Sequence, residues 1–288
     1  MTPRPDPALW EGLPVPPPHP WPGARVFDRS VLCRQADFET GWFAWWTDSL
    51  GERLRYHRKL WEFVFVAQAL HERACLRVGA RGLGFGVGHE PLPAAFAARG
   101  CRITATDQAL DAAIQSGWAE SDQHALSLAQ QLGRAEVGPL QLLAAQVDFR
   151  AVDMTAVPDD LTGYDFCWSA CALEHLGSIQ AGLDFIRRSL ATLRPGGVAV
   201  HTTEFNLSSD DATVDHAGTV LFRAQDLHRL AAELTAEGHQ VAPLDLTPGE
   251  GPIDRWLDMA PYVDEPHLKL ALEGYEITSV GLIVTRGP

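Results

Sequence analysis

Hydrophobic positions along the chain switch between short apolar runs and the three- or four-residue steps of amphipathic helices. Apolar runs predict strands over Gly82 to Val87, Cys101 to Ala105, Val147 to Val152, Tyr164 to Ser169, Val198 to Thr203, Gln240 to Leu246 and Tyr275 to Thr285. Helical periodicity lies between them, over residues 91–99, 110–131, 179–193 and 224–237. Strands that alternate with helices predict an α/β fold, with a parallel sheet covered by helices on both faces.

The region before the first of these strands differs in pattern. Residues 1–30 are predicted to form a proline-rich arm, because proline fixes φ and removes a backbone donor. Residues 31–75 carry helical periodicity with a break near Gly51, and they are expected to form an N-terminal helical cap or lid. Residues 76–288 then form the main domain, with an insert at about 247–274 before the last strand.

Aromatic side chains gather in the predicted cap. They are Trp42, Trp45, Trp46, Tyr56, His57 and Trp61. Packing in the core is the favoured interpretation. The alternative is a lid whose aromatic walls receive a sugar ring or a flat ligand. A second candidate wall is the insert, through Arg255, Trp256, Tyr262 and His267.

Composition narrows the class of protein. The chain has 288 residues, 46% of them hydrophobic, which is typical of a globular protein. Its net charge of −14 disfavours binding to nucleic acids or to anionic membranes. The cysteines have neither disulfide nor zinc-site spacing and are expected to be free thiols in a reducing compartment. No signal peptide and no membrane-spanning run is recognised, so a cytoplasmic location is predicted.

A glycine-rich turn and an acid mark the first candidate site. Gly86 and Gly88 follow the first main-domain strand, where glycine lets the backbone approach a ligand closely. Asp107 ends the next strand about 20 residues later, where a carboxylate can accept from both ribose hydroxyls. This pattern alone predicts a nucleotide site and also fits an NAD-dependent oxidoreductase.

Three later motifs favour another cofactor. Val152-Asp153-Met154 follows the third strand, Leu173-Glu174-His175-Leu176 follows the fourth, and Leu193-Arg194-Pro195-Gly196-Gly197 leads into the fifth. In this order, after the glycine turn and Asp107, they resemble the class I methyltransferases that use S-adenosylmethionine (SAM). The resemblance covers residues 76–205 best. It implies a Rossmann-like, seven-stranded, mostly parallel sheet with an antiparallel last strand.

The resemblance also implies roles for individual residues. Gly86 and Gly88 would pass under the methionine part of SAM, Asp107 would hold the ribose, Asp153 and the Met154 amide would read the adenine, and Ser169 and Ala170 would lie beside the sulfonium. The chain departs from the family at Gly84, where a carboxylate is common. Glu90, just after the turn, and water are the two candidates to replace it in holding the SAM ammonium.

Candidate general bases are His201, His175 and Glu204. His201 is placed best, because the carboxyl ends of parallel strands face the crevice. His175 is more readily a cofactor-side or packing residue. The acidic stretch from Glu204 to His216 offers oxygen ligands for magnesium or calcium. A solvated polar loop is the favoured interpretation, so no metal is predicted.

The predicted function is transfer of a methyl group from SAM to oxygen or nitrogen of a small polar acceptor, such as a sugar-bearing or other specialised metabolite. One alternative keeps SAM but uses it in a non-methylating displacement or cyclisation. Another is a non-catalytic nucleotide-binding scaffold. The expected partner is the small-molecule acceptor, and the aromatic cap helices pack either within their own chain or against a second copy in a homodimer.

Overall fold

The computed structural model describes residues 26–109, 137–138 and 140–288. The proline-rich arm up to residue 25 and the predicted helix over 110–131 lie outside these residues. None of the described helices is both long enough and apolar enough to span a membrane.

A ten-stranded sheet organises the molecule, with the strand order β10-β1-β12-β6-β5-β2-β3-β4 along its main path. The parallel strands are β2 (Arg81–Phe85), β3 (Arg102–Asp107), β4 (Val147–Ala151), β5 (Tyr164–Ala170) and β6 (Leu193–Asn206). The last strand, β12 (Tyr275–Thr285), runs antiparallel to β6. The predicted α/β class, mostly parallel sheet and antiparallel last strand are therefore confirmed.

The edge beyond β12 is built from short pieces. The predicted strand over Gln240 to Leu246 is split into β9 (Gln240–Val241), which pairs with β12, and β10 (Leu244–Asp245). Between β10 and β12 lies β1 (Ser30–Leu32), which comes from the N-terminal region. Within the insert, β11 (Leu270–Leu272) also pairs with β12. Separately, β7 (Asp215–His216) and β8 (Thr219–Val220) form a hairpin of their own.

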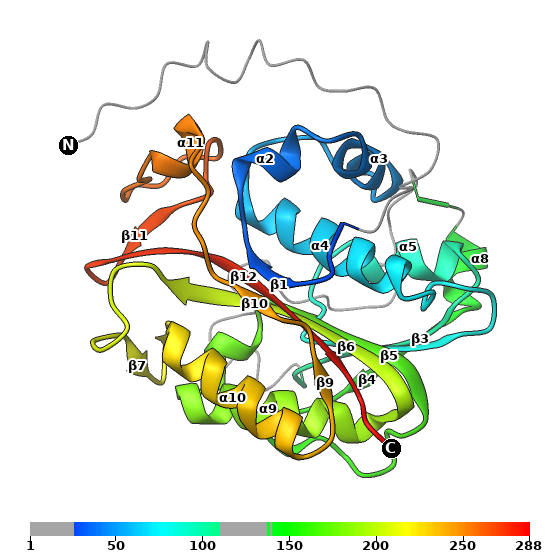
Figure 1. Ribbon diagram of the computed structural model, residues 1–288. Coiled ribbons are helices and arrows are strands. Elements are labelled where there is room, and N and C mark those ends of the chain that lie inside the picture. Colours follow the sequence, from blue (N-terminus) through cyan, green and yellow to red (C-terminus); the bar gives the residue numbers. More distant parts are fainter. Residues whose placement is uncertain (1–25, 110–136, 139) are drawn as a thin grey trace.

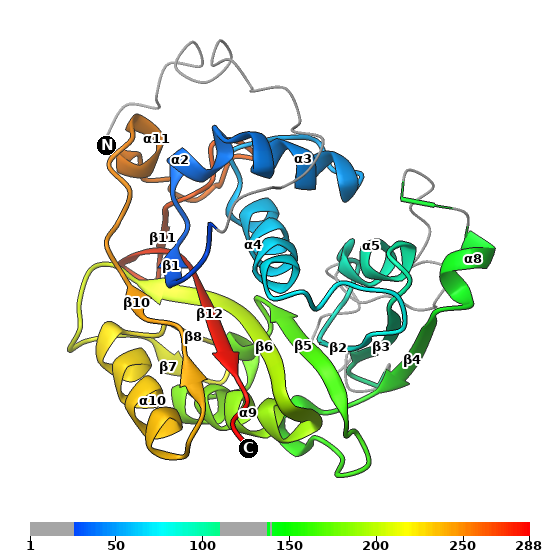
Figure 2. The same cartoon turned by 45° about the vertical axis from the view of Figure 1, so that its right-hand side comes forward.

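Helices cover both faces of the sheet (Figures 1 and 2). One face carries α2 (Gln35–Phe38), α3 (Gly41–Ser49), α4 (Arg58–Glu72), α5 (Leu92–Ala98) and α8 (Leu140–Ala144). The other carries α9 (Ile179–Thr192) and α10 (Ala224–Ala236). A short helix, α11 (Pro252–Arg255), lies in the insert, and the single turns η1 (Met154–Ala156) and η2 (Leu173–His175) follow β4 and β5.

Helix α4 lies between the sheet and α3, and it is buried on nearly all sides. Trp46 and Trp61 are fully buried in the core on this face. Each indole N–H has a partner, since Trp46 donates to Gln68 at 2.6 Å and Trp61 donates to Asp37 at 2.7 Å. Two of the four tryptophans of the predicted cap are therefore core residues, and α4 reaches the centre of the molecule.

Candidate functional site

A cavity of about 320 Å³ opens where β2, β3, β4 and β5 end. This is the carboxyl edge of the parallel sheet, where open α/β sheets bind ligands. Residues predicted from the sequence that line it are Gly86, Gly88, Glu90, Asp107, Met154, Ala170 and His175. Lining residues without a predicted role include Lys59, Phe63, His89, Cys171 and Leu176. The predicted residues Gly84, Asp153, Ser169, His201 and Glu204 are not part of the lining.

The turn after β2 approaches the opposite wall closely. Gly86 has φ of +59° and Gly88 has φ of +43°, in the left-handed region that favours glycine. A Cβ at Gly86 would lie 2.8 Å from the Ala172 Cβ and 3.4 Å from the Met154 sulfur. Any larger residue at Gly86 would therefore fill the space where the turn borders the cavity.

Asp107 is held at the cavity wall by backbone groups. Its Oδ2 accepts from the Gly88 amide at 2.9 Å, and its Oδ1 accepts from the Gln108 amide at 2.7 Å. The first bond ties the end of β3 to the glycine turn. The carboxylate is thus oriented before a ligand arrives, which reduces the entropy lost on binding.

The structure explains why Gly84 is glycine. A Cβ at this position would lie 2.4 Å from Trp168 Cζ2 and 2.6 Å from Val87 Cγ1. The indole of Trp168 therefore occupies the space that a side chain at Gly84 would need. Its N–H donates to Glu90 Oε1 at 2.5 Å, and Glu90 lines the cavity. The carboxylate at this end of the cavity thus comes from the turn and is held by Trp168.

Val152 and Met154, at the position where the sequence predicts adenine binding, both line the cavity. Asp153, between them, caps the turn η1, because its Oδ1 accepts from the amide and the hydroxyl of Thr155, each at 2.7 Å. The Asp153 side chain is thus turned to its own backbone in this structure. Of the pair at the end of β5, Ala170 borders the cavity and Ser169 is buried beneath it.

The three candidate bases have different surroundings. His175 lines the cavity, and its Nδ1 lies 3.2 Å from the Gly218 carbonyl oxygen. A carbonyl can only accept, so Nδ1 carries the proton in this contact and Nε2 is the unprotonated nitrogen of the neutral ring. Glu204 lies outside the cavity lining, with Arg58 Nη2 donating to it at 2.5 Å.

His201 is fully buried in the sheet, away from the cavity lining. Its Nδ1 lies 2.8 Å from Ser169 Oγ and its Nε2 lies 2.9 Å from Ser189 Oγ, so both ring nitrogens have partners. Burial lowers the pKa of His201 to about 3, because the charged form loses its hydration. The structure therefore does not bring His201 to the site, because His201 lies inside β6, which continues to Asn206, and not at the end of the strand where the sequence placed it.

A buried ionic cluster lies directly behind the cavity. Glu62 of α4 has no exposed side-chain surface and faces Arg58 Nη1 at 3.2 Å and Lys59 Nζ at 3.4 Å. It also accepts from the Cys171 thiol at 3.0 Å and from the Ser279 hydroxyl. Burial alone would raise the pKa of Glu62, but Lys59 and Arg58 bring it below its ordinary value. The cluster joins α4 to β5 and β12.

Cys171 connects this cluster to the cavity. It lines the cavity immediately after β5 and has φ of +51°, a strained conformation for a residue with a Cβ. Burial and the nearby carboxylates of Glu174 and Glu62 raise the pKa of its thiol well above the ordinary value. The thiol therefore stays protonated and donates to Glu62.

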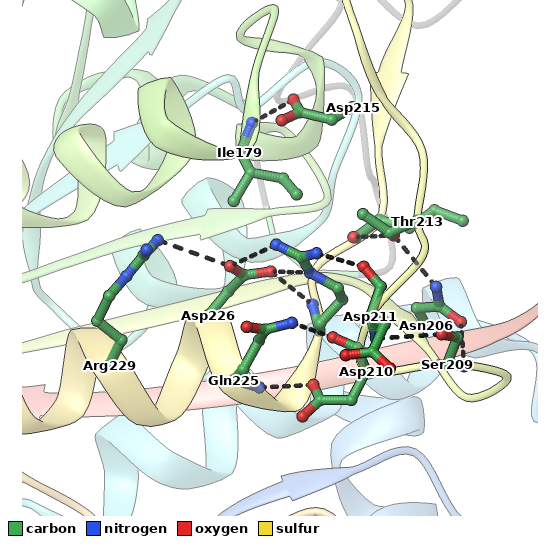
Figure 3. A network of polar contacts seen from close by, with 12 residues as sticks. Ile179, Asn206, Ser209, Asp210, Asp211, Thr213, Asp215, Gln225, Asp226 and Arg229 are labelled. Carbon is green, nitrogen blue, oxygen red and sulfur yellow. Dashed lines mark hydrogen bonds and ion pairs between the residues drawn. The ribbon is translucent and has the colours of Figure 1, made fainter.

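Carboxylates of the acidic loop after β6 accept hydrogen bonds from backbone amides at the starts of two helices (Figure 3). Asp210 Oδ1 accepts from the Gln225 amide at 2.7 Å, and Asp215 Oδ1 accepts from the Ile179 amide at 2.9 Å. These carboxylates satisfy donors at the first turns of α10 and α9. Within the part of the chain that the structure describes, no three His, Cys, Asp or Glu side chains are grouped to hold a metal ion.

The insert contacts the cap rather than the cavity. The imidazoles of His57 and His267 stack with ring centroids 4.5 Å apart, and the Arg58 amide donates to the His267 carbonyl at 2.9 Å. His267 Nδ1 lies 2.7 Å from Asp258 Oδ2. Neither the four insert residues predicted to form a wall nor the six aromatic residues of the cap line the cavity.

Comparisons with models of known protein families and with curated proteins found no match. Solved structures do match. A Galdieria sulphuraria protein assigned as a sarcosine dimethylglycine methyltransferase shares 15% identity, covering 79% of this chain and 86% of that one with a TM-score of 0.50. The glycopeptide N-methyltransferase MtfA (14% identity, 76% and 94% covered, TM-score 0.45) and the magnesium protoporphyrin IX methyltransferase from Synechocystis PCC 6803 (13%, 80% and 79%, 0.45) also match. The first similarity shows the fold, which is the Rossmann-like fold of class I methyltransferases.

Proposed function

We propose that this chain is a SAM-dependent methyltransferase that acts on oxygen or nitrogen of a small polar acceptor. The observation that carries the proposal is the cavity itself. Three features lie along its wall: a glycine turn with no room for a Cβ at Gly86, a pre-oriented carboxylate at Asp107, and the pair Val152 and Met154. Their order matches the order of the methionine arm, ribose and adenine of SAM.

Each part of the cofactor has a matching group. Asp107 accepts from the ribose hydroxyls, Met154 borders the adenine, and Glu90 holds the ammonium of the methionine arm. Phe63 and Leu176 supply apolar surface that keeps water from the reacting atoms. When bound, SAM supplies an electrophilic methyl group, so the protein's task is to align the acceptor and to manage its proton.

His175 is the proposed base. Its Nδ1 keeps its proton and donates it in a hydrogen bond to the Gly218 carbonyl, and its Nε2 takes the proton that the acceptor hydroxyl or amine releases as the methyl group is transferred. The acceptor is proposed to be a sugar-bearing or other specialised metabolite, in keeping with the polar groups His89 and His175 around the cavity.

Replacing Asp107 with alanine should weaken SAM binding by about 1–3 kcal/mol, because the ribose donors lose a charged acceptor. Isothermal calorimetry with SAM and with S-adenosylhomocysteine measures the change. The control is Asp148→Ala, which removes an exposed carboxylate from neighbouring β4 and should leave the affinity unchanged. Undiminished affinity in Asp107→Ala would reject the ribose assignment, and a wild-type protein that binds neither compound would reject the proposed function.

Replacing His175 with glutamine should lower kcat by about 100-fold while the affinity for SAM changes little, because general-base catalysis contributes 10²–10⁴-fold. His228→Gln, at an exposed position of α10, serves as the control. An unchanged kcat in His175→Gln would remove this residue from the mechanism.

The same assays distinguish the alternatives. A non-methylating displacement or cyclisation that transfers the aminobutyrate arm releases methylthioadenosine in place of S-adenosylhomocysteine. The sequence-based reason for considering it was Gly84, and the position of Trp168 now accounts for that residue. A scaffold would bind without turnover, and retention of NADH but not SAM would favour an oxidoreductase.

A further inference from the structure

Helix α4 supplies the cation of the cavity. Lys59 and Phe63, one helical turn apart, both line it, and Lys59 is the single lysine or arginine among the described lining residues. Its side chain is 36% exposed, whereas the neighbouring Arg58 is 14% exposed and directed to Glu204. Lys59 is therefore the positive charge that a ligand in this cavity meets.

The ammonium of Lys59 is anchored loosely enough to accept a second partner. Its Nζ lies 3.4 Å from Glu62 Oε2, and Arg58 shares the same carboxylate at 3.2 Å. A lysine ammonium has three donors. Among the described residues, Glu62 is the partner with which Lys59 Nζ forms an ion pair, so this contact uses one of these donors.

The remaining charges of the cavity are complementary to a zwitterion. The carboxylates that line it are Glu90 and Asp107, and Asp107 is tied to the amides of Gly88 and Gln108. Lys59 and Glu90 thus provide one positive and one negative side chain in a cavity whose volume is near the lower end for ligand sites. An amino-acid group, with one carboxylate and one ammonium, matches this pair of charges.

We propose that Lys59 holds the carboxylate of the methionine arm of SAM, so that α4 forms part of the cofactor site. The inference rests on the proposed function, because it takes SAM as the ligand. Glu62 acts as a positioning residue, which holds the lysine side chain against the cavity wall from behind.

The test compares SAM with decarboxylated SAM, which lacks the carboxylate and keeps the rest of the molecule. Calorimetry on the wild-type protein should show SAM binding at least about tenfold more tightly, since charge-assisted hydrogen bonds are the strong ones. In Lys59→Met this preference should vanish, because the affinity for SAM falls while the affinity for decarboxylated SAM stays the same. Lys269→Met is the matched control, because Lys269 is paired with Glu276 outside the cavity, and it should keep the preference.

Lys59→Gln is a second variant, to be used if Lys59→Met fails to fold, because the glutamine amide can still donate a hydrogen bond to Glu62. A preference for SAM that persists in either folded variant would overturn the proposal. So would an unchanged SAM affinity with a raised KM for the acceptor, which would place Lys59 on an anionic group of the acceptor. Failure of the wild-type protein to bind SAM or decarboxylated SAM would instead reject the proposed function, and this inference with it.

Discussion

Replacing Gly84 with aspartate, which restores the carboxylate common at this position in the family, should destabilise the protein by at least about 4 kcal/mol. The new Cβ, on the fourth residue of β2, would lie 2.4 Å from the buried ring of Trp168 in neighbouring β5. Overpacking of this kind costs about 1–3 kcal/mol, and a buried carboxylate without a partner adds to it. Urea denaturation measures the free energy of unfolding.

A double-mutant cycle separates the steric part of this destabilisation from the part that is due to the buried charge of the new aspartate. Gly84→Ala and Trp168→Leu should each destabilise the protein, but together they should cost less than the sum, because the shorter side chain makes room for the new methyl group. Gly138→Asp is the control, since its Cβ would meet only ordinary contacts at 3.7 Å from Leu143. Additive costs in the cycle would show that Trp168 does not explain Gly84.

Replacing Glu62 with leucine should lower the free energy of unfolding by about 3–5 kcal/mol, as expected when one partner of a buried ion pair is removed. Arg58 and Lys59 would lose a shared carboxylate, and the Cys171 thiol and the Ser279 hydroxyl would lose their acceptor. The hydrophobic side chain would therefore face four donors inside the core. Thermal and urea denaturation both report the loss.

An exposed ion pair provides the comparison for Glu62. Asp160 and Arg150 form two hydrogen bonds at the surface, and Asp160→Asn should change stability little because solvent screens the pair. Equal losses in Asp160→Asn and Glu62→Leu would contradict the view that burial makes the Glu62 cluster important.

The central strands and helices could be predicted from the sequence because each is long compared with the few residues by which its predicted ends are uncertain. The predicted strand at Tyr164 to Ser169 is β5, Tyr164–Ala170, and the predicted helix 224–237 is α10, Ala224–Ala236. Such elements bury one or both faces over many residues, so their periodicity is clear. The three residues of β1 have too little pattern to be recognised, since their strand conformation depends on partners more than 200 residues away.

The residues of the candidate site likewise divide into those that the sequence could predict and those that it could not. Asp107 and the glycine turn were recognisable because they adjoin each other on one strand–turn–helix–strand unit. Lys59 was missed because it comes from another part of the chain, although Glu62 in the otherwise apolar run WEFVFVA was a signal of a buried charge. His201 was placed on the correct strand but wrongly at its end, since β6 continues to Asn206, and its two serine partners could be identified only from the packing of α9 and β5 against β6.

The position of β1 has a consequence for how the chain folds while it is being synthesised. Ser30 pairs with Leu244, and Leu32 pairs with Val280 on the last strand. The first strand of the described residues therefore leaves the ribosome long before its neighbours exist. Pairings so distant in sequence are slow to form, and unpaired strand edges promote aggregation. Strand β1 must wait, unpaired, until the residues up to Gly281 are made, and only then is this edge of the sheet completed.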